Sequence, residues 1–460
     1  MSDMIEKALQ FKRDHSARFL EELITFVSIP SISTDITVKL DMQRAADWVA
    51  GQLRDLKMSR VQVMPTTGHP VVFGESLQAG KDKPVVLVYG HYDVQPAEPL
   101  ELWHTPPFEP TRSGENLFGR GASDMKGQVV ACLKAIESLS ASGNLPVNLK
   151  FLIEGEEEIG SPNLVAFIRE NKDLLASDFA LNPDSGMLSP DVPTITYGLR
   201  GLAYFEVRVS GPMQDLHSGL FGGAVHNPAQ ALCELIAGMH DENGRVTLPG
   251  FYNRVRELDP EERAELARLP IGEDFYLKQT GVPALFGEKG YTSLERVGGR
   301  PTLEVNGLSS GFTGEGQKTV LPAKAFAKIS MRLVPDQDPT EVHQQLVTYM
   351  EDHAPKTIKW EVIKMASGRA SITDRNHPAV EMLARAMEDT WGVSPVFKRE
   401  GGSVPVVGQL HDILGIDSVL TGFGLPDDNL HAPNEKLHLP TFYNGIEALI
   451  RFFGYLGSSK

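Results

Sequence analysis

Acidic and imidazole side chains recur where predicted strands end. They are His91 and Asp93 after residues 85–90, Glu156, Glu157 and Glu158 after residues 147–153, Asp184 after residues 179–181, and His431 after residues 419–423. Asp124 lies in a tight glycine-rich loop, Gly119 to Asp124, that opens a helix. In open α/β sheets the ligand crevice lies beyond the carboxyl ends of the strands, so we expect these side chains to meet there.

The joint pattern predicts a metal site, although each residue has an ordinary structural interpretation when taken alone. An Asp in a glycine-rich loop is more often a turn or cap residue, and a run of Glu is more often a solvated face. Together, however, clustered acids repel one another unless a cation holds them. Two imidazoles with carboxylates suit Zn²⁺, Mn²⁺ or Co²⁺, and the carboxylates are too many for one tetrahedral zinc. Two metals that share a carboxylate fit better.

The elements that position these residues form an α/β domain. Continuous apolar runs predict strands buried on both faces, and the order strand, helix, strand indicates a mostly parallel sheet between helices. The predicted elements are a helix over 3–27, strands at 85–88, 147–153 and 178–181, a helix through 129–136, a helix beginning at Ser161-Pro162, and, from Pro378, a helix to Trp391, a strand at 418–423 and a terminal helix through 442–453.

A second domain interrupts the first. Residues 202–209 alternate between apolar and polar side chains, which is typical of a half-buried strand in a different sheet. This strand begins the order strand, helix, two strands, helix, strand, which contains a charged insertion at 241–300. The order predicts a ferredoxin-like α+β domain. We therefore expect a discontinuous catalytic, metal-binding domain of residues 1–201 and 375–460, and an inserted lid or dimerisation domain of residues 202–374.

Composition agrees with two domains and excludes several partners. The chain has 460 residues, 41% of them hydrophobic, which exceeds the size at which one core stops growing. Its net charge of −16 disfavours nucleic acid and anionic membranes as partners. The charged N-terminus and the absence of a long apolar run predict a cytoplasmic protein. Cys132 and Cys233 lie in helix-like patterns and are interpreted as small buried hydrophobes.

Several segments together resemble the M20 family of dinuclear metallopeptidases, in particular its dipeptidase branch, which includes cytosolic nonspecific dipeptidases and carnosinases. The segments agree with the family in order and spacing over nearly the whole chain. They are Gly90 to Pro96, Gly119 to Gly127, Glu154 to Ser161, Asp215 to Gly219, Arg399 to Ser403, and His431 to Lys436.

The resemblance implies a role for each candidate. One metal takes His91, Asp124 and Asp184, and the other takes Asp124, Glu158 and His431, with Asp124 as the bridge. Asp93 accepts a hydrogen bond from the other nitrogen of His91 and fixes its tautomer. Glu157 is the general base, because water between two divalent cations ionises near neutral pH and gives its proton to a nearby carboxylate. Glu156 has no role in this pattern.

The resemblance also implies a substrate and an assembly. Arg332 binds the free C-terminal carboxylate of a dipeptide or short peptide, with Thr319 and Ser403 nearby, since a guanidinium offers a planar carboxylate two parallel hydrogen bonds. His217 stabilises the tetrahedral oxyanion and comes from the neighbouring subunit of a homodimer. The chain departs from the family at Met125, where Asp is frequent.

Other functions remain open or are excluded. The main alternative is an N-acyl amino acid amidohydrolase of deacetylase or desuccinylase type, which the same residues serve. A catalytically inactive, metal-stabilised binding protein is disfavoured because a binder has no use for a general base at Glu157. Residues 307–311 match a serine hydrolase elbow, but glycines follow where a helix is needed. Residues 311–319 fail the phosphate-loop spacing, and no thermolysin-type zinc helix is present.

Overall fold

The computed structural model describes residues 2–35, 37, 39–402 and 404–458. The described chain divides into two compact units. The first comprises residues 1–197, 373–398 and 404–460, and the second comprises residues 198–372 and 399–403. None of the helices in the described ranges is long and apolar enough to cross a membrane.

The first unit is built on a mixed, largely buried sheet in the order β1-β2-β6-β3-β7-β17-β8. The central pairs β6-β3, β3-β7 and β7-β17 are parallel, whereas β2 joins β6 antiparallel. The strands are β1 (Arg60–Met64), β2 (Val71–Ser76), β3 (Val85–His91), β6 (Asn148–Glu154), β7 (Phe179–Asn182), β8 (Thr194–Leu199), β16 (Val396–Glu400), which also pairs with β8, and β17 (Ser418–Leu420). Every residue of β6 is buried, which explains its unbroken apolar pattern.

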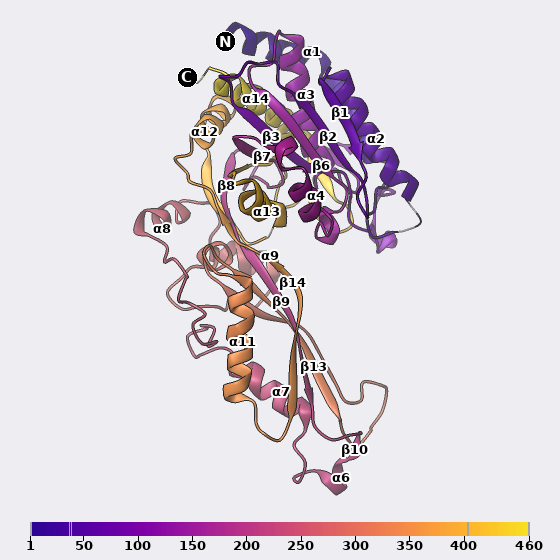
Figure 1. Cartoon of the computed structure of the whole chain (residues 1–460), viewed down its shortest axis with the longest axis vertical. Helices are drawn as coiled ribbons and strands as arrows, with labels where there is room; N and C mark the ends of the chain where they lie inside the picture. Colours follow the sequence, from indigo (N-terminus) through magenta and orange to yellow (C-terminus); the bar gives the residue numbers. More distant parts are fainter. Residues whose placement is uncertain (1, 36, 38, 403, 459–460) are drawn as a thin grey trace. The chain divides into compact units, whose positions relative to one another are not determined.

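Helices cover both faces of this sheet (Figure 1). The helices are α1 (Ser2–Val27), α2 (Lys39–Asp55), α3 (Lys126–Ala141), α4 (Leu164–Glu170), α5 (Lys172–Leu175), α12 (Pro378–Trp391), α13 (Pro405–Leu414) and α14 (Leu439–Leu456). Short elements complete the unit: η2 (Leu100–Leu102), η3 (Glu157–Ile159), and the small sheet of β4 (Thr111–Ser113), β5 (Asn116–Phe118) and β18 (Lys436–His438). Helix α3 is buried nearly all round because it packs between the sheet, α1 and α14.

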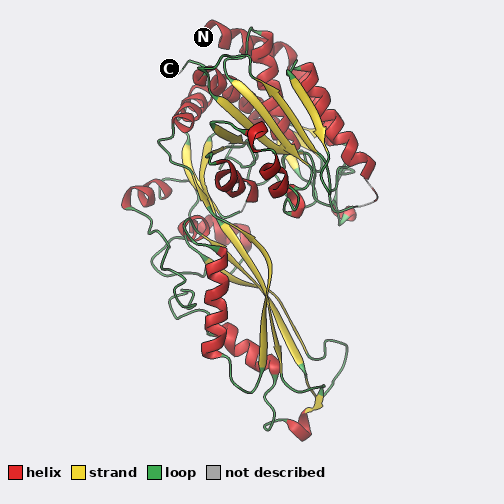
Figure 2. Ribbon diagram, in the orientation of Figure 1, coloured by secondary structure: helices red, strands yellow, loops and turns green. Residues whose placement is uncertain are grey.

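The second unit carries a four-stranded antiparallel sheet in the order β11-β13-β9-β14. Its strands are β9 (Gly201–Ser210), β11 (Thr302–Ser310), β13 (Lys324–Leu333) and β14 (Lys359–Gly368). Helices α7 (Pro228–Ala237) and α11 (Pro339–His353) run along one face (Figure 2). Phe205, Val207 and Val209 point into the core they share with these helices. The remaining elements are β10 (Leu216–His217), α6 (Ser218–Phe221), α8 (Pro260–Leu266), α9 (Glu273–Thr280), α10 (Ser293–Gly299), β12 (Val320–Leu321) and β15 (Ser371–Ile372).

These observations confirm the predicted fold class. The chain order β9-α7-β11-β13-α11-β14 and the sheet order are those of a ferredoxin-like domain. The predicted inserted domain covers residues 202–374, and the main segment of the second unit covers residues 198–372. The short segment 399–403 also groups with the second unit.

Three local expectations were wrong or incomplete. Helix α4 begins at Leu164 and not at Ser161-Pro162, because Ser161 adopts a left-handed backbone (φ 51°) and its N–H closes a turn on the Glu156 carbonyl. Cys132 is buried, but Cys233 is exposed, since it lies on the face of α7 opposite the core residues Ala231, Leu232 and Leu235. Helix α2 and strands β1 and β2 were not predicted.

Candidate metal centre

The predicted ligands lie at one edge of the first unit's sheet. His91 is the last residue of β3, Asp184 comes two residues after β7, and Glu158 lies in the short turn η3 that follows β6. Because β3, β6, β7 and β17 are mutually parallel, their carboxyl ends share this edge. His431 lies in the loop after β17, and Asp124 precedes α3.

Asp124 stands between two groups of ligand atoms. His91, Asp124 and Asp184 form one group, and Asp124, Glu158 and His431 form the other; in each, the ligand atoms lie within 4.8 Å of one another. Asp124 Oδ1 is 3.3 Å from Nε2 of His91, and Asp124 Oδ2 is 2.9 Å from Nε2 of His431. Nε2 of His431 is also 3.2 Å from Oε2 of Glu158. The two oxygens of one carboxylate therefore face two different imidazoles, which is the geometry that a bridging ligand needs.

The charges of this edge are strongly coupled. Burial disfavours the protonated form of His91, but the nearby carboxylates of Asp124 and Asp93 outweigh burial and raise the pKa of His91 well above its ordinary value. Hydrogen bonds to Asp124 and Glu158 raise the pKa of His431 to about 10. Burial would raise the pKa of Asp124, but the two imidazoles hold it well below its usual range. In the metal-free protein, two imidazolium groups therefore balance part of the acidic charge.

The pKa values of Asp184 and Glu157 are shifted in the other direction from that of Asp124. Burial and the charge of Asp124 raise the pKa of Asp184 well above its ordinary value. Burial raises the pKa of Glu157 to about 8; the charge of His91 opposes this shift, and the charges of Glu158 and Asp124 add to it. Such a cluster is costly without compensating positive charge.

The donor set fits divalent cations. Nε2 of His91 is fully buried and has no hydrogen-bond partner in the described part of the chain, although it points toward Asp124. Imidazole nitrogens combined with carboxylate oxygens are ligands that Zn²⁺, Mn²⁺ and Co²⁺ accept. His91, Asp124 and Asp184 could hold one ion, and Asp124, Glu158 and His431 a second.

Asp93 supports this edge through several contacts. Nδ1 of His91 is 3.0 Å from the backbone carbonyl oxygen of Asp93 and 3.4 Å from its Oδ1, so the carbonyl is the nearer acceptor. The Asp93 carboxylate also accepts the backbone N–H groups of Glu157 (3.2 Å) and Glu158 (3.1 Å). Asp93 thus orients the imidazole of His91, with its carbonyl as the nearer acceptor, and its carboxylate fixes the turn that carries two acids.

Glu157 and Glu156 point in different directions from Glu158. Glu157 Oε2 is 4.0 Å from Nε2 of His91, but Glu157 belongs to neither of the ligand groups found among the described residues. Glu156 accepts hydrogen bonds from the His69 N–H and the Asn163 amide, and it is buried away from the ligands. The three consecutive acids therefore have three different environments.

Sequence reasoning missed two supporting side chains. The Gln95 amide donates to Oε2 of Glu158 (2.8 Å) and fixes that carboxylate. Glu435 is buried and accepts the Asp124 N–H (3.1 Å). Both lie within segments that carry the family resemblance. A search for acids and imidazoles directly after predicted strands does not select them, because Gln95 is an amide and Glu435 lies late in the loop after β17.

The predicted substrate residues lie in the second unit where they are described. His217 is exposed at the end of β10, and its Nδ1 accepts the Gly219 N–H (3.0 Å), so a neutral His217 carries its proton on Nε2. Arg332 is half-buried on β13, opposite Thr302 and Leu202. Thr319 is exposed immediately before β12. Ser403 lies outside the described residues.

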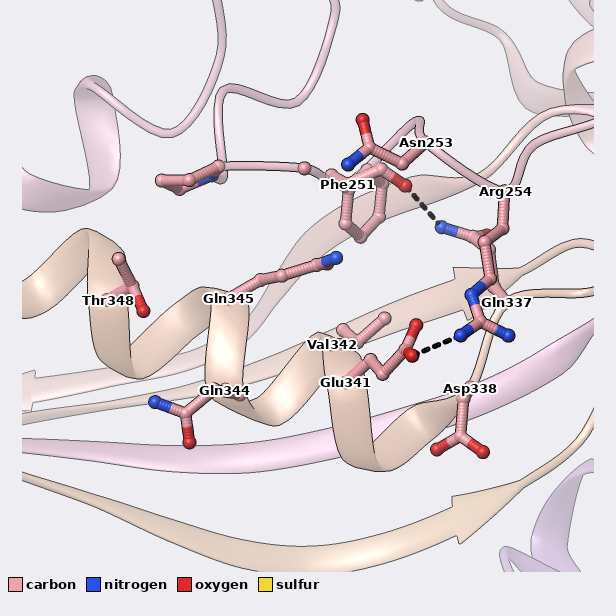
Figure 3. A pocket seen from close by; sticks show the side chains of 12 residues that line it. Phe251, Asn253, Arg254, Gln337, Asp338, Glu341, Val342, Gln344, Gln345 and Thr348 are labelled. Carbon is pink, nitrogen blue, oxygen red and sulfur yellow. Dashed lines mark hydrogen bonds and ion pairs between the residues drawn. The ribbon is translucent and has the colours of Figure 1, made fainter.

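A pocket of about 430 Å³ also lies in the second unit, between α11 and residues 249–254 (Figure 3). Seven of its 12 lining residues carry amide or charged side chains, and Arg254 pairs with Glu341 at one side (2.5 Å). Gln337 donates to the Phe251 carbonyl (2.9 Å). None of the predicted metal or substrate residues lines this pocket.

The chain is similar to known peptidases over nearly its whole length. The model of "Peptidase family M20/M25/M40" matches residues 87–454. The chain is 34% identical to the Cys-Gly metallodipeptidase dug1 of Schizosaccharomyces pombe, over 99% of this chain and 98% of the relative. It is 32% identical to the Beta-Ala-His dipeptidase of Homo sapiens, over 98% and 92%. Among solved structures, it is similar to the M20 family metallo-carboxypeptidase Sso-CP2 from Sulfolobus solfataricus (TM-score 0.86, 33% identity, 96% of this chain and 99% of that chain).

A match of this extent defines the class of protein. The chain belongs to peptidase family M20/M25/M40. Within that family it is an enzyme of the metallodipeptidase kind.

Proposed function

We propose that the protein hydrolyses the peptide bond of dipeptides, or of short peptides with a free C-terminal carboxylate, with two divalent metal ions. The observation that carries this proposal is the placement of Asp124, whose two oxygens face His91 and His431 while Glu157 stands beside them outside both ligand groups. Ligands for two cations and a spare carboxylate are the parts that metal-assisted hydrolysis requires.

Glu157 is the general base of this reaction. Bound metal ions would favour ionisation of water and polarise the scissile carbonyl. Glu157 takes the proton of the attacking water and passes it to the leaving amine, because its carboxylate is largely buried and close to the ligands without belonging to them. Asp93 and Gln95 hold the neighbouring side chains His91 and Glu158 in position for this transfer.

Arg332, Thr319 and Ser403 select the substrate. The guanidinium of Arg332 pairs with the free carboxylate of the peptide, and hydroxyl groups add hydrogen bonds to it. The names of the relatives support small peptides such as Cys-Gly and β-Ala-His as the first substrates to test. We propose zinc or manganese as the metal, with cobalt as a third option, and the cytoplasm as the location.

His217 completes the active site of a partner subunit in a homodimer. Its Nδ1 is occupied by the Gly219 N–H, so its Nε2–H is available to donate to an oxyanion. His217 is exposed on its own chain, which supports a role in a second chain.

One assay separates this function from its nearest rival. Metal-replete protein is given Cys-Gly, β-Ala-His, their C-terminal amides, and matched N-acetyl and N-succinyl amino acids. The proposal expects hydrolysis of the free dipeptides with kcat/KM well above all other compounds. Faster hydrolysis of the N-acyl amino acids would identify the protein as an N-acyl amino acid amidohydrolase. No turnover of any compound despite bound metal would identify it as a binding protein without catalysis.

A further inference from the structure

A buried ion pair lies beneath the predicted metal edge. Arg120 and Glu435 are each 1% exposed, and Arg120 Nη1 donates to Glu435 Oε2 at 2.8 Å. The two residues are 315 positions apart in the sequence. Glu435 belongs to neither ligand group found in the described chain, so its burial is not explained by direct metal binding.

Glu435 accepts four hydrogen bonds with one carboxylate. Its Oε2 accepts the Gly121 N–H (2.9 Å) as well as Arg120, and its Oε1 accepts the N–H groups of Ser123 (3.0 Å) and Asp124 (3.1 Å). A carboxylate has acceptor sites for all four donors. Glu435 therefore fixes the backbone of the loop at the residue that stands between the two ligand groups.

Arg120 extends the same contact to two more loops. Its Nη2 donates to the carbonyl of Pro96 (3.1 Å), five residues after His91, and to the carbonyl of Ala432 (3.2 Å), next to His431. Its guanidinium also lies over the ring of Trp103 (5.4 Å). The pair thus joins the loops that follow His91, contain Asp124 and carry His431.

We propose that Glu435 is a positioning residue that orders both metal sites before metal binds. This inference rests on the proposed metal-dependent function. A ligand that bridges two ions must present both oxygens in fixed directions, and the backbone of Asp124 is held by Glu435 rather than by a neighbour in sequence. In Glu435→Gln, an NH₂ group replaces one carboxylate oxygen, so two N–H groups of the loop face another donor and lose their acceptor. The loop then shifts, and Asp124 no longer presents its two oxygens in the directions that a bridging ligand needs.

The matched control is a buried carboxylate with the same kind of partner and no link to the predicted ligands. Glu288 is 5% exposed and receives two hydrogen bonds from Arg300 (2.8 Å each) and one from Arg245 (2.8 Å). It lies in the second unit, whereas all predicted metal ligands lie in the first. Glu288→Gln therefore reports the effect of losing a buried acid–arginine pair alone.

The experiment compares Glu435→Gln with Glu288→Gln and the wild type by chelator competition for Zn²⁺, by the absorption spectrum of the Co²⁺-loaded protein, and by metal-free Tm. We expect Glu435→Gln to lower the affinity for both metal ions by roughly 10- to 100-fold and to change the Co²⁺ absorption spectrum. Glu288→Gln should lower Tm and leave both metal readouts as in the wild type. Wild-type metal affinity and spectrum in folded Glu435→Gln would overturn the inference. These readouts do not depend on peptide hydrolysis, so an inactive but metal-binding wild type would refute the proposed function alone.

A measurement on the unaltered protein decides the case if Glu435→Gln does not fold. Hydrogen exchange of the peptides that cover residues 119–126 is followed in metal-free wild type. Positioning requires the amides of Gly121, Ser123 and Asp124 to be protected without metal, because Glu435 already binds them. Rapid exchange that slows only when metal is added would show that metal orders this loop and would overturn the inference.

Discussion

Replacing Glu157 with Gln separates the general base from the metal ligands. The substitution keeps the size of the side chain and removes its ability to take a proton. Glu157 Oε2 lies 4.0 Å from His91 Nε2, whereas Glu158 Oε2 lies 3.2 Å from His431 Nε2 within a ligand group. The structure therefore predicts that the variant keeps every ligand atom of both groups.

The expected loss is that of one general base. Such groups contribute typically 10²- to 10⁴-fold, which corresponds to about 3–5 kcal/mol in the barrier at 1.36 kcal/mol per tenfold change. We expect kcat to fall by this factor for a free dipeptide, with both metals retained and little change in KM. The measurements are steady-state kinetics and metal content by elemental analysis on the same sample.

The adjacent acid provides the control. Glu156→Gln changes a carboxylate one position away, but Glu156 is occupied by His69 and Asn163 and faces away from the ligands. It should keep kcat within a few fold of the wild type. Loss of metal in Glu157→Gln would mean that Glu157 is a ligand and that its role has been exchanged with that of Glu158.

Four further predictions follow from the proposed function. Asp124→Ala should remove both ions together, since each loses an oxygen of the same carboxylate; retention of one ion at full affinity would contradict the bridge. Arg332→Ala should weaken the binding of free dipeptides by about 2–5 kcal/mol and the binding of their C-terminal amides much less. Equal losses of kcat/KM for both would mean that Arg332 has a structural role. Mixing Glu157→Ala with His217→Ala should restore about a quarter of wild-type activity after subunit exchange, and no recovery despite exchange would refute a site shared between subunits. The pKa of His431 is about 10 without metal, so below this pH a metal ion must displace the proton of His431. The apparent metal affinity should therefore rise between about pH 6 and 9, and calorimetry in two buffers should detect the released proton. A metal affinity that does not change with pH would contradict this assignment. The same raised pKa stabilises the metal-free protein at pH values below the unfolded value of about 6.5, and this contribution is lost as the pH rises toward 10.

The sequence was informative where chemistry and local pattern coincide. Buried parallel strands have continuous apolar runs, and their ends place His91 and Asp184 on one edge without any knowledge of distant contacts. The residues alone did not divide Glu157 from Glu158, because adjacent acids in a turn have equivalent spacing. That division came from the family resemblance, and the structure adds the different surroundings of the two carboxylates.

Contacts between distant segments could not be read from local patterns. The hydrogen bond from Asp124 to Glu435 joins residues 311 positions apart, and no periodicity records it. The exposure of Cys233 depends on which face of α7 packs on the sheet, which the helix pattern of a short segment leaves open. The turn ending at Ser161 depends on hydrogen bonds to Glu154 and Glu156, and these delayed the start of α4.

The charge of the edge argues for two cations rather than one. Asp124, Glu157, Glu158 and Asp184 bring four negative charges when ionised, and the ligand atoms of each group lie within 4.8 Å of one another. At an effective dielectric constant of about 20, a pair of unit charges 4 Å apart interacts by roughly 4 kcal/mol, so each uncompensated pair is costly. One divalent ion would leave two of the four charges, whereas two ions balance all four and allow both imidazoles to be neutral ligands. Without metal, the nearby carboxylates raise the pKa of His91 and His431, and burial raises the pKa of Asp184 and Glu157, so metal binding at this edge displaces protons and depends on pH.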